Sequence, residues 1–222
     1  MYAKKVMYFW RHTVKSYLKP LLFACSALVG VSPAFAAIDV NNSFSPATLY
    51  PTQVSRITLR LQNSSLNDSV SVNLPNVLPN GVFIASTPNI NNTCGGSVSA
   101  TNDASKGTIT LTAGTIPHGD GTNPGFCLVQ VDVVANSKGT YINTIASGAL
   151  TGITNGTPES NATAASATLA VILQDLSGSI SSPLSGILQG NETAVQTITL
   201  TNPNPVALTG MGFTYDLWNS AY

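Results

Sequence analysis

His118 is the only histidine after position 12, which makes it the one candidate for the base of a hydrolytic triad in the body of the chain. A triad needs a nucleophile, a base and an orienting acid within hydrogen-bond reach. The surrounding residues 116–121, IPHGDG, predict an exposed turn, and the sequence has no G-x-S-x-G elbow. We therefore interpret His118 as a loop residue and expect a protein that is not an enzyme, with no catalytic and no cofactor-binding residues.

The same loop offers oxygen atoms of the kind that calcium prefers, on Asp120 and Asn123. A dedicated calcium loop supplies more carboxylates at regular spacing. Glycine, aspartate and asparagine together are instead typical of an ordinary turn. We expect a turn here and no metal site, and the sequence leaves calcium binding open.

The chain has three cysteines, Cys25, Cys94 and Cys127. Cys25 lies in an N-terminal segment that we expect to be removed on export. Outside the cytosol disulfides persist, so the simplest expectation is one Cys94–Cys127 bridge. On the chain-entropy account such a loop closure stabilises the domain by about 3 to 4 kcal/mol. Two cysteines and one histidine are too few ligands for a structural zinc site.

The first 36 residues have the features of a secretory signal peptide. Five of the nine Lys and Arg residues precede position 20 and are followed by the apolar run Leu21–Val31. This run is shorter than the roughly 20 residues that span a membrane, so we expect no stable membrane span after cleavage. Ala34 and Ala36 flank Phe35 in an A-x-A arrangement, which predicts cleavage between Ala36 and Ala37. We therefore expect an exported protein, at the cell surface, outside the cell or in the periplasm.

Removal of this segment makes the chain mildly acidic. Four basic residues remain against nine acidic ones, a net charge of −5. A basic patch that would bind nucleic acid or an anionic membrane surface is not available in such a sequence. We expect no nucleic-acid partner. The remaining basic residues are Arg56, Arg60, Lys106 and Lys138.

The elements that position these residues are predicted to be short β-strands separated by Gly, Pro and Asn turns. In Phe126–Val134 a period of two places Cys127 on the core face with three valines. No window after the signal has the periodicity of an amphipathic helix, so we predict an all-β sandwich. Strands are expected at Ser55–Gln62, Val70–Leu74, Val82–Ala85, Ser97–Ala100, Thr108–Thr112, Phe126–Val134, Tyr141–Ile145 and Ala165–Leu173.

Three segments are predicted to lie outside the strands. Pro75 is expected to end the strand before it, because proline donates no ladder hydrogen bond. The polar, Gly-rich span Ser147–Ala162 is expected to be a long loop. Residues Gln174–Ser182, QDLSGSISS, are expected to be a short polar connector.

The pattern of Arg56–Asn63, RITLRLQN, has a second copy in Thr197–Asn204, TITLTNPN. In both, β-branched residues or leucine alternate with polar residues and end at an asparagine. An offset of 139 residues carries Leu61 to Leu200, Asn63 to Asn202 and Leu78 to Leu217. The sequence therefore predicts a repeat protein whose second repeat is incomplete.

A series of short motifs resembles the bacterial conserved-repeat domain of unknown function, found in tandem in large exported surface proteins. The resemblance covers about Val40–Ile172 and, for the start of a second copy, Ile180–Trp218. It implies an immunoglobulin-like sandwich repeat and brings no catalytic residues. Pro75–Pro79, PNVLP, departs from the family by lacking an aspartate. The motifs are Ser43–Asn63, Pro79–Val82, Thr93–Gly96, Thr115–Pro117, Cys127 with its valines, and Gly139–Ile145.

These observations predict a signal peptide at residues 1–36, an immunoglobulin-like β-sandwich repeat at 37–174, and a linker with an incomplete second repeat at 175–222. The first repeat should fold alone, whereas Leu176–Tyr222 should not, because a small piece buries too little apolar surface. The strand Ala194–Thr201 would then expose an edge able to recruit a strand from another chain. We expect the chain to be part of a longer repeat protein.

The function that we predict is that of a non-catalytic exported bacterial surface protein, a structural stalk or an adhesion module. Its expected partners are other surface proteins or host cell-surface ligands. One alternative is a carbohydrate-binding accessory domain of an exported hydrolase. Clustered aromatic rings would favour it, yet Trp218 is the only tryptophan after the signal. The other alternative is a pilus-like subunit assembling by strand exchange, which the incomplete second repeat permits.

Overall fold

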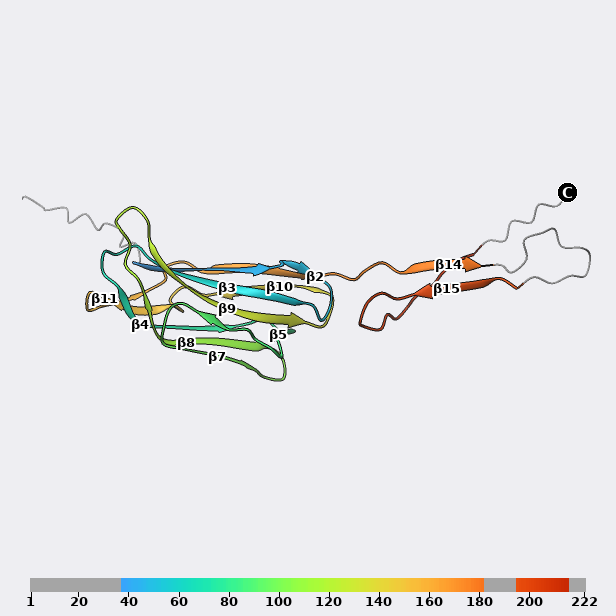
Figure 1. Cartoon of the computed structure of the whole chain (residues 1–222), viewed down its shortest axis with the longest axis horizontal. Coiled ribbons are helices and arrows are strands. Elements are labelled where there is room, and N and C mark those ends of the chain that lie inside the picture. Colours follow the sequence, from blue (N-terminus) through green and yellow to red (C-terminus); the bar gives the residue numbers. More distant parts are fainter. Residues whose placement is uncertain (1–36, 182–194, 216–222) are drawn as a thin grey trace, which may run out of the picture. The chain divides into compact units, whose positions relative to one another are not determined.

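The computed structural model describes residues 37–181 and 195–215. These residues form β-strands joined by turns, and none of them belongs to a helix long and apolar enough to cross a membrane. The strands between Ile38 and Val171 build one domain, here called the sandwich domain (Figure 1). Two further strands, β14 (Ser177–Ser181) and β15 (Thr197–Thr201), pair with each other and are called the C-terminal hairpin.

One layer of the sandwich domain is an antiparallel sheet with β3 and β9 at its centre. The alternating residues of β3 pair with those of β9, so that Leu59 lies opposite Val129 and Leu61 opposite Cys127. The strands run in the order β1 (Ile38–Ser45), β3 (Val54–Asn63), β9 (Gly125–Ala135) and β5 (Val82–Ile84), and β6 (Asn91–Asn92) also pairs with β9.

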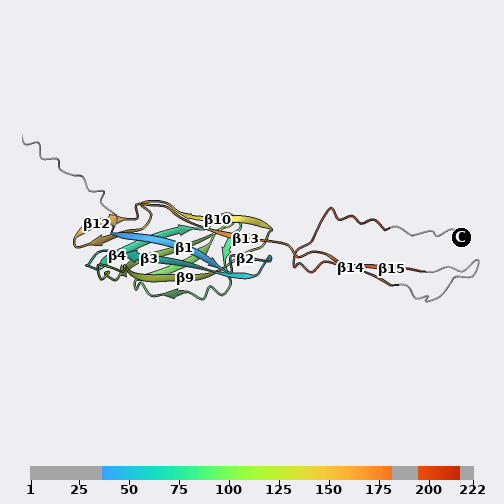
Figure 2. The same ribbon diagram turned by 90° about the horizontal axis from the view of Figure 1, so that it is seen from above.

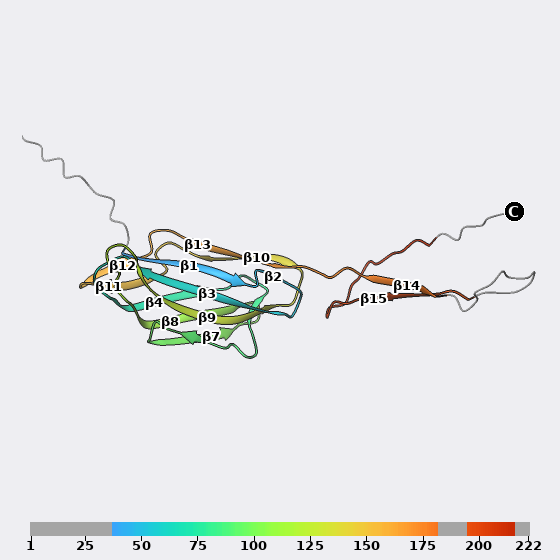
Figure 3. The same cartoon turned by 45° about the horizontal axis from the view of Figure 1, so that its top comes forward.

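The second layer contains five strands, and Figures 1 and 3 both show its β7 and β8 below β3 and β9. Its order is β12 (Thr157–Ser160), β11 (Thr151–Thr154), β4 (Ser69–Val77), β8 (Gly107–Ile116) and β7 (Ser97–Asn102). A smaller sheet of β10 (Gly139–Ile145), β13 (Ala165–Val171) and β2 (Thr48–Leu49) brings β13 beside β1 (Figure 2).

The core lies between the two layers and is formed by the inward residues of both. In β3 every second residue is buried, and Leu59 and Leu61 are at most 1% exposed. Ile109 and Leu111 of β8 and Val129 of β9 belong to the same buried cluster. Burial of each such side chain contributes about 1.5 to 3 kcal/mol relative to exposure. The prediction of an all-β, immunoglobulin-like sandwich is confirmed.

Cys94 and Cys127 form the predicted disulfide, with Cα atoms 4.9 Å apart and a sequence separation of 33. Both cysteines are buried. The backbone N–H of Thr115 in β8 donates to the carbonyl of Cys94 at 2.7 Å, so the bridge joins β9 of one layer to a segment held by the other layer. Gly96, two residues on, has φ +62° and lies too close to the carbonyl oxygen of Thr112 for a Cβ atom, which makes glycine necessary there.

Pro75 does not end its strand, contrary to the expectation from the sequence. β4 continues to Val77, and Pro75 pairs with Thr110 of β8. The other neighbour of β4, β11, pairs with β4 only as far as Asn73. The edge of β4 beside Pro75 therefore needs no N–H donor, which is the position where a strand tolerates proline.

The span Ser147–Ala162 is not a long loop, and that expectation was wrong. It contains the hairpin β11–β12, whose turn residues Asn155 and Gly156 have φ of 50° and 77°. Two positive φ values define the turn type that the pair Asn-Gly favours in two-residue hairpins. The strands themselves, TGIT and TPES, have too few apolar residues to be recognised by alternation.

The expected connector Gln174–Ser182 also contains a strand, since residues 177–181 form β14. Its partner β15 begins at Thr197, and Ala194, the first residue of the expected strand, lies outside the described residues. The expected strand therefore exists and has β14 on one of its edges.

Candidate functional site

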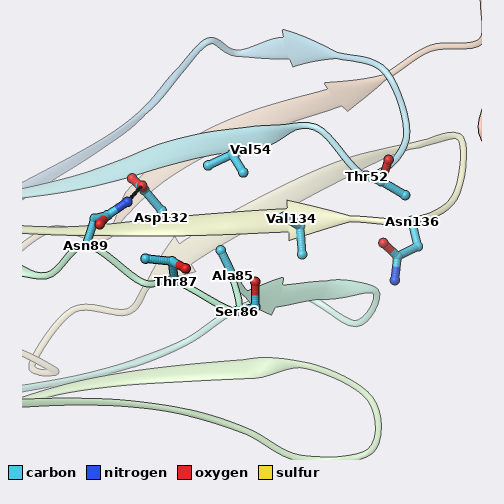
Figure 4. A pocket seen from close by; sticks show the side chains of 9 residues that line it. All are labelled: Thr52, Val54, Ala85, Ser86, Thr87, Asn89, Asp132, Val134 and Asn136. Atoms are coloured by element: carbon cyan, nitrogen blue, oxygen red, sulfur yellow. Dashed lines mark hydrogen bonds between the residues drawn. The ribbon is translucent and has the colours of Figure 1, made fainter.

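A pocket of about 410 Å³ lies on the outer side of the β3–β9 sheet, near the end of β9 (Figure 4). Three segments far apart in the sequence form it: the turn that leads into β3, the loop that follows β5, and the last residues of β9 with the residue after them. Figure 4 shows Asn89 and Asp132 pointing toward each other at one end and Thr52 at the other. The lining residues are Thr52, Val54, Ala85, Ser86, Thr87, Asn89, Asp132, Val134 and Asn136.

Backbone hydrogen bonds hold the three segments together. The N–H of Thr52 donates to the carbonyl of Ala135 at 3.0 Å. Two bonds join the loop after β5 to Asp132. The N–H of Ala85 donates to the carbonyl of Asp132 at 2.9 Å, and the N–H of Asp132 donates to the carbonyl of Pro88 at 2.8 Å. The pocket walls are therefore fixed by the main chain rather than by side-chain packing alone.

The carboxylate of Asp132 is the best-connected group of the site and is only 8% exposed. Arg56 Nε donates to its Oδ1 at 2.8 Å, and Asn89 Nδ2 donates to its Oδ2 at 2.7 Å. Arg56 Nη2 also donates to the carbonyl of Asn89 at 3.3 Å. Asn89 has a φ of 42°, a region that asparagine tolerates better than most residues. The three residues form a closed polar cluster at one end of the pocket.

The hydrogen bond from Arg56 is the main cause that holds the pKa of Asp132 below its ordinary value. Burial acts in the opposite direction, while the hydrogen bond from Asn89 and the charge of Arg56 lower the pKa further. The same hydrogen bond raises the pKa of Arg56. At neutral pH Asp132 is therefore an anion whose two oxygens are already bound, which suits it to hold the loop and not to transfer protons.

The remainder of the lining gives the pocket its chemistry. Thr52, Ser86 and Thr87 supply hydroxyl groups, and Asn136 supplies an amide. Each of these groups both donates and accepts hydrogen bonds. Val54 and Val134 add an apolar strip. This lining suits a small, uncharged ligand rich in hydroxyl or amide groups, and the nine lining residues include no aromatic ring.

His118 lies in an exposed loop, as predicted, but it has a partner that the sequence did not reveal. Its Nδ1 is 2.7 Å from Oδ1 of Asp68, and its backbone N–H donates to the same oxygen at 2.8 Å. The hydrogen bond from the His118 side chain is the main cause that lowers the pKa of Asp68. The side chains of His118 and Asp68 are 61% and 51% exposed. An exposed pair of this kind fixes the loop and excludes no water from a reaction.

Asp120 and Asn123, the candidate calcium ligands, form a turn with each other. Asp120 Oδ1 accepts hydrogen bonds from the backbone N–H groups of Thr122 and Asn123 at 2.8 and 2.6 Å. The bond from Asn123 is the main cause that lowers the pKa of Asp120. Asn123 Nδ2 donates to the second carboxylate oxygen at 3.2 Å. Within residues 37–181 and 195–215 no group of three or more His, Cys, Asp and Glu is placed to hold a metal ion.

The predicted cleavage site is only half described, because Ala36 lies outside the described residues. Ala37 is in the described part, and its carbonyl accepts a hydrogen bond from the N–H of Ser64 at 2.8 Å. Ala37 is therefore joined to the turn that follows β3. Cleavage between Ala36 and Ala37 stays a prediction.

A family model described as a domain of unknown function (DUF7933) matches residues 39–171. The chain belongs to this family. The matched residues coincide with the sandwich domain, and with the stretch Val40–Ile172 over which the sequence resembles a conserved-repeat domain of unknown function. No curated protein matches the chain.

Several solved structures resemble the DUF7933 domain at low sequence identity. A non-cellulosomal cohesin from Archaeoglobus fulgidus has 12% identity and a TM-score of 0.41, covering 63% of this chain and 92% of its own. The bacterial hydrophobin BslA has 17% identity and a TM-score of 0.40, and the match covers 64% of this chain and 98% of BslA. The major pilin subunit of Bacillus cereus has 8% identity and a TM-score of 0.40, and the match covers 76% of this chain and 56% of the pilin chain. Likenesses at this level say nothing about a ligand or a partner.

The sequence did not reveal the pocket of the DUF7933 domain. Its residues lie in three separate stretches, and no single sequence motif joins them. The Arg56–Asp132 pair required the register of β3 on β9, in which these two residues are direct cross-strand partners. The sequence did contain one usable signal, since Arg56 and Asp132 both occupy the outward positions of strongly alternating strands.

Proposed function

We propose that the chain is a non-catalytic module of an exported surface protein that serves as a stalk or an adhesion unit. The proposal depends first on a recurring β unit. A surface protein built of such units extends away from the cell by adding copies, and each copy needs only its own core to fold.

The observation that carries the proposal is one asparagine turn that occurs twice, 139 residues apart. Asn63 Oδ1 accepts from the backbone N–H two residues ahead at 2.9 Å, and its Nδ2 donates to the carbonyl four residues ahead at 2.8 Å. Asn202 makes the same two bonds at 3.0 and 2.8 Å. Each turn follows a strand with the same alternation, β3 or β15. This agreement supports a second copy of the unit.

Two further features support export. The N-terminal 36 residues have the charge and apolar pattern of a signal peptide. The buried Cys94–Cys127 disulfide is of a kind that persists outside the cytosol. Together they support the proposal that the sandwich domain works in an oxidising compartment.

Surface labelling of intact cells with a membrane-impermeant reagent tests the location, and N-terminal sequencing of the extracted protein tests cleavage between Ala36 and Ala37. We expect labelling and a mature chain that begins at Ala37. A cell-binding assay with the purified protein then separates an adhesion unit from a stalk. A protein confined to the cytoplasm, or one that turns over a substrate by itself, contradicts the proposal.

The pocket favours a second candidate, an accessory domain that binds carbohydrate. Its hydroxyl and amide lining suits a ligand rich in hydroxyl groups. A glycan array tests this with the variant Thr87→Val, which removes a lining hydroxyl without changing volume greatly. Thr101→Val, at an exposed position of β7, is the matched control. Glycan binding that Thr87→Val weakens and Thr101→Val leaves unchanged supports this candidate, and an array without signal contradicts it.

A further inference from the structure

β7 is an edge strand of the second layer, and no other described strand pairs with its outer edge (Figure 3). It pairs with β8 from Ser97 to Asn102 without a shift in register. No described backbone group outside β8 bonds to the main chain of these residues. An open edge of this length is a ready template for a further strand.

The hydrogen-bond pattern of the β7–β8 ladder identifies the main-chain groups at this edge. The N–H of Asp103 donates to the carbonyl of Lys106 at 2.9 Å, so the ladder begins with a hydrogen-bonded pair. In an antiparallel ladder such pairs alternate with non-hydrogen-bonded pairs. The continuous register therefore turns the N–H and C=O groups of Ser99 toward β8. The same groups of its neighbours Val98 and Ala100 point toward the free edge.

The side chains of β7 alternate between the two faces of the sheet. Val98 and Ala100 are partly buried and pack against the core. Ser97, Ser99 and Thr101 are exposed on the outer face. The sequence of the strand, SVSATN, contains neither a charge nor a proline. A strand added at this edge would therefore meet small, uncharged side chains.

The other edges of the sandwich domain are protected against pairing. Natural proteins protect an edge with charges, prolines, a very short strand or a covering element. β12 carries Pro158 and Glu159, and β1 carries Asp39 and lies beside β13. β10 lies beside β4, and β2, β5 and β6 have only two or three residues each. Within the sandwich domain, β7 is thus the strand edge that has none of these protections.

The edge of β7 is complementary to a second copy of itself. Antiparallel pairing centred on Ser99 places Val98 of each copy opposite Ala100 of the other copy. Both pairs would be hydrogen-bonded, because the main-chain groups of these residues point toward the edge. The pairing also keeps the apolar residues on the core face and the hydroxyl groups on the outer face. A centre at Ala100 would instead place Val98 opposite the polar Asn102.

We propose that the edge of β7 joins two copies of this chain about a two-fold axis at Ser99, so that their second layers form one continuous sheet. A ladder of about five residue pairs buries less than the roughly 1,200 Å² of a standard interface, so the dimer is weak in solution. Copies held side by side would pair more completely, because their effective concentration is high. The inference does not rest on the proposed function, since the edge belongs to the sandwich domain alone.

Sedimentation velocity of the oxidised full chain over a wide range of protein concentration tests the proposal. The decisive variant is Ser99→Lys, which places two like charges opposite each other at the axis. Thr110→Lys is the matched control, because Thr110 is the direct partner of Ser99 and carries the charge on the same face one strand farther in. We expect a dimer whose Kd Ser99→Lys raises at least about tenfold. Thr110→Lys should raise it less than about threefold, since its charges are farther apart and screened.

A charge-swap experiment tests the position of the axis. Ser99→Asp alone should weaken the dimer as Ser99→Lys does. An equimolar mixture of the two variants should associate again, because opposite charges then face each other across the ladder. Fluorescence energy transfer between the separately labelled variants measures this association. Its return shows that both variants are folded.

Three results overturn the proposal: no association at any concentration, an equal effect of Ser99→Lys and Thr110→Lys, or no energy transfer in the mixture of Ser99→Lys and Ser99→Asp. The last result means that the copies meet at another surface or in another register. Labelling of intact cells reports only where the protein is located. A failure of this inference is therefore distinguishable from a failure of the proposed function.

Discussion

The strands β3 and β15 have related sequences and opposite environments. β3 and β15 share an alternation of apolar and polar residues that ends at an asparagine turn. Leu61 is fully buried, whereas its counterpart Leu200 is 44% exposed. Because the local pattern is the same, it does not by itself determine burial. The second layer, which covers the inward face of β3 with residues such as Ile109 and Leu111, makes that strand one side of a core.

The comparison also shows where the stability of this fold arises. A two-stranded hairpin is marginal in water, and three or more strands with a covered face are needed for independent stability. The sandwich domain meets this condition with two layers and a disulfide across them. The hairpin β14–β15 has one ladder of five residue pairs. The two regions should therefore respond very differently to the same perturbation.

Separation of the two regions has the largest expected effect. The fragment of residues 37–174 should melt cooperatively, whereas the fragment of residues 175–222 should show no cooperative transition, because it cannot close a core. Circular dichroism during thermal melting measures both. A cooperative melt of the short fragment contradicts this prediction. The melt is recorded at several protein concentrations to exclude a transition that depends on association.

A matched pair of core substitutions comes next. Leu61→Ala should lower the free energy of unfolding by about 2 to 5 kcal/mol, because it removes a buried side chain and leaves a cavity. Leu200→Ala should change it by less than about 0.5 kcal/mol, as expected at an exposed site. Urea unfolding of the full chain measures both under oxidising conditions. Equal costs at the two positions mean that Leu200 is buried in solution by something that binds it.

The asparagine turns give a smaller difference. Asn63 is fully buried and bonds to three backbone groups, so Asn63→Ala leaves buried polar groups unsatisfied. We expect a loss of about 1 to 3 kcal/mol. Asn202 is exposed, so water replaces its bonds in Asn202→Ala, and the loss should stay within about 0.5 kcal/mol. Urea unfolding again measures the pair, and the reverse order contradicts the assignment of burial.

The sequence predicted the central strands well because their signal is local. The central residues of β3 and β9 place an apolar side chain at every second position, and both strands appear close to their expected bounds. β1 was missed because Asn42 interrupts its apolar series between Val40 and Phe44. β11 and β12 were missed because their strands are short and polar, although the Asn155-Gly156 turn was present as a signal. Pro75 was misjudged because its effect depends on which edge of β4 is paired.

The pocket was beyond prediction for a different reason. Asp132 is recognisable as an outward residue of β9, but its carboxylate is bound by Arg56 and Asn89. Arg56 reaches it through the register of two strands 76 residues apart in sequence. Asn89 reaches it through a loop conformation with positive φ. Such contacts depend on tertiary arrangement, whereas the disulfide needed only two cysteines and an oxidising compartment.

The smallest expected effect is a pH dependence that belongs to the sandwich domain. The folded-state pKa of Asp132 is lowered, chiefly by the hydrogen bond from Arg56. A lowered folded pKa means that the ionised form stabilises the fold above the unfolded value of about 3.9, and that this contribution disappears as the pH falls through the folded pKa. Asp132→Asn keeps the shape and an acceptor for Asn89 but removes the charge. The variant should therefore be less stable than the natural chain at pH 7, and the difference should shrink below about pH 4.

Urea unfolding at a series of pH values measures the stability of the variant and of the natural chain. Other carboxylates with lowered pKa values, such as Asp68, Asp103 and Asp120, contribute equally to both proteins, so their effect cancels in the difference. Thr199→Asp provides the control in the C-terminal hairpin, because an exposed carboxylate without a partner has the same pKa in the folded and unfolded chain. Its difference from the natural chain should not change with pH. A stability difference for Asp132→Asn that stays constant from pH 7 to pH 3 shows that the Arg56 bond does not favour the ionised carboxylate. In that case the backbone bonds of Asp132 to Pro88 and Ala85, rather than the charge of its carboxylate, hold this end of the pocket.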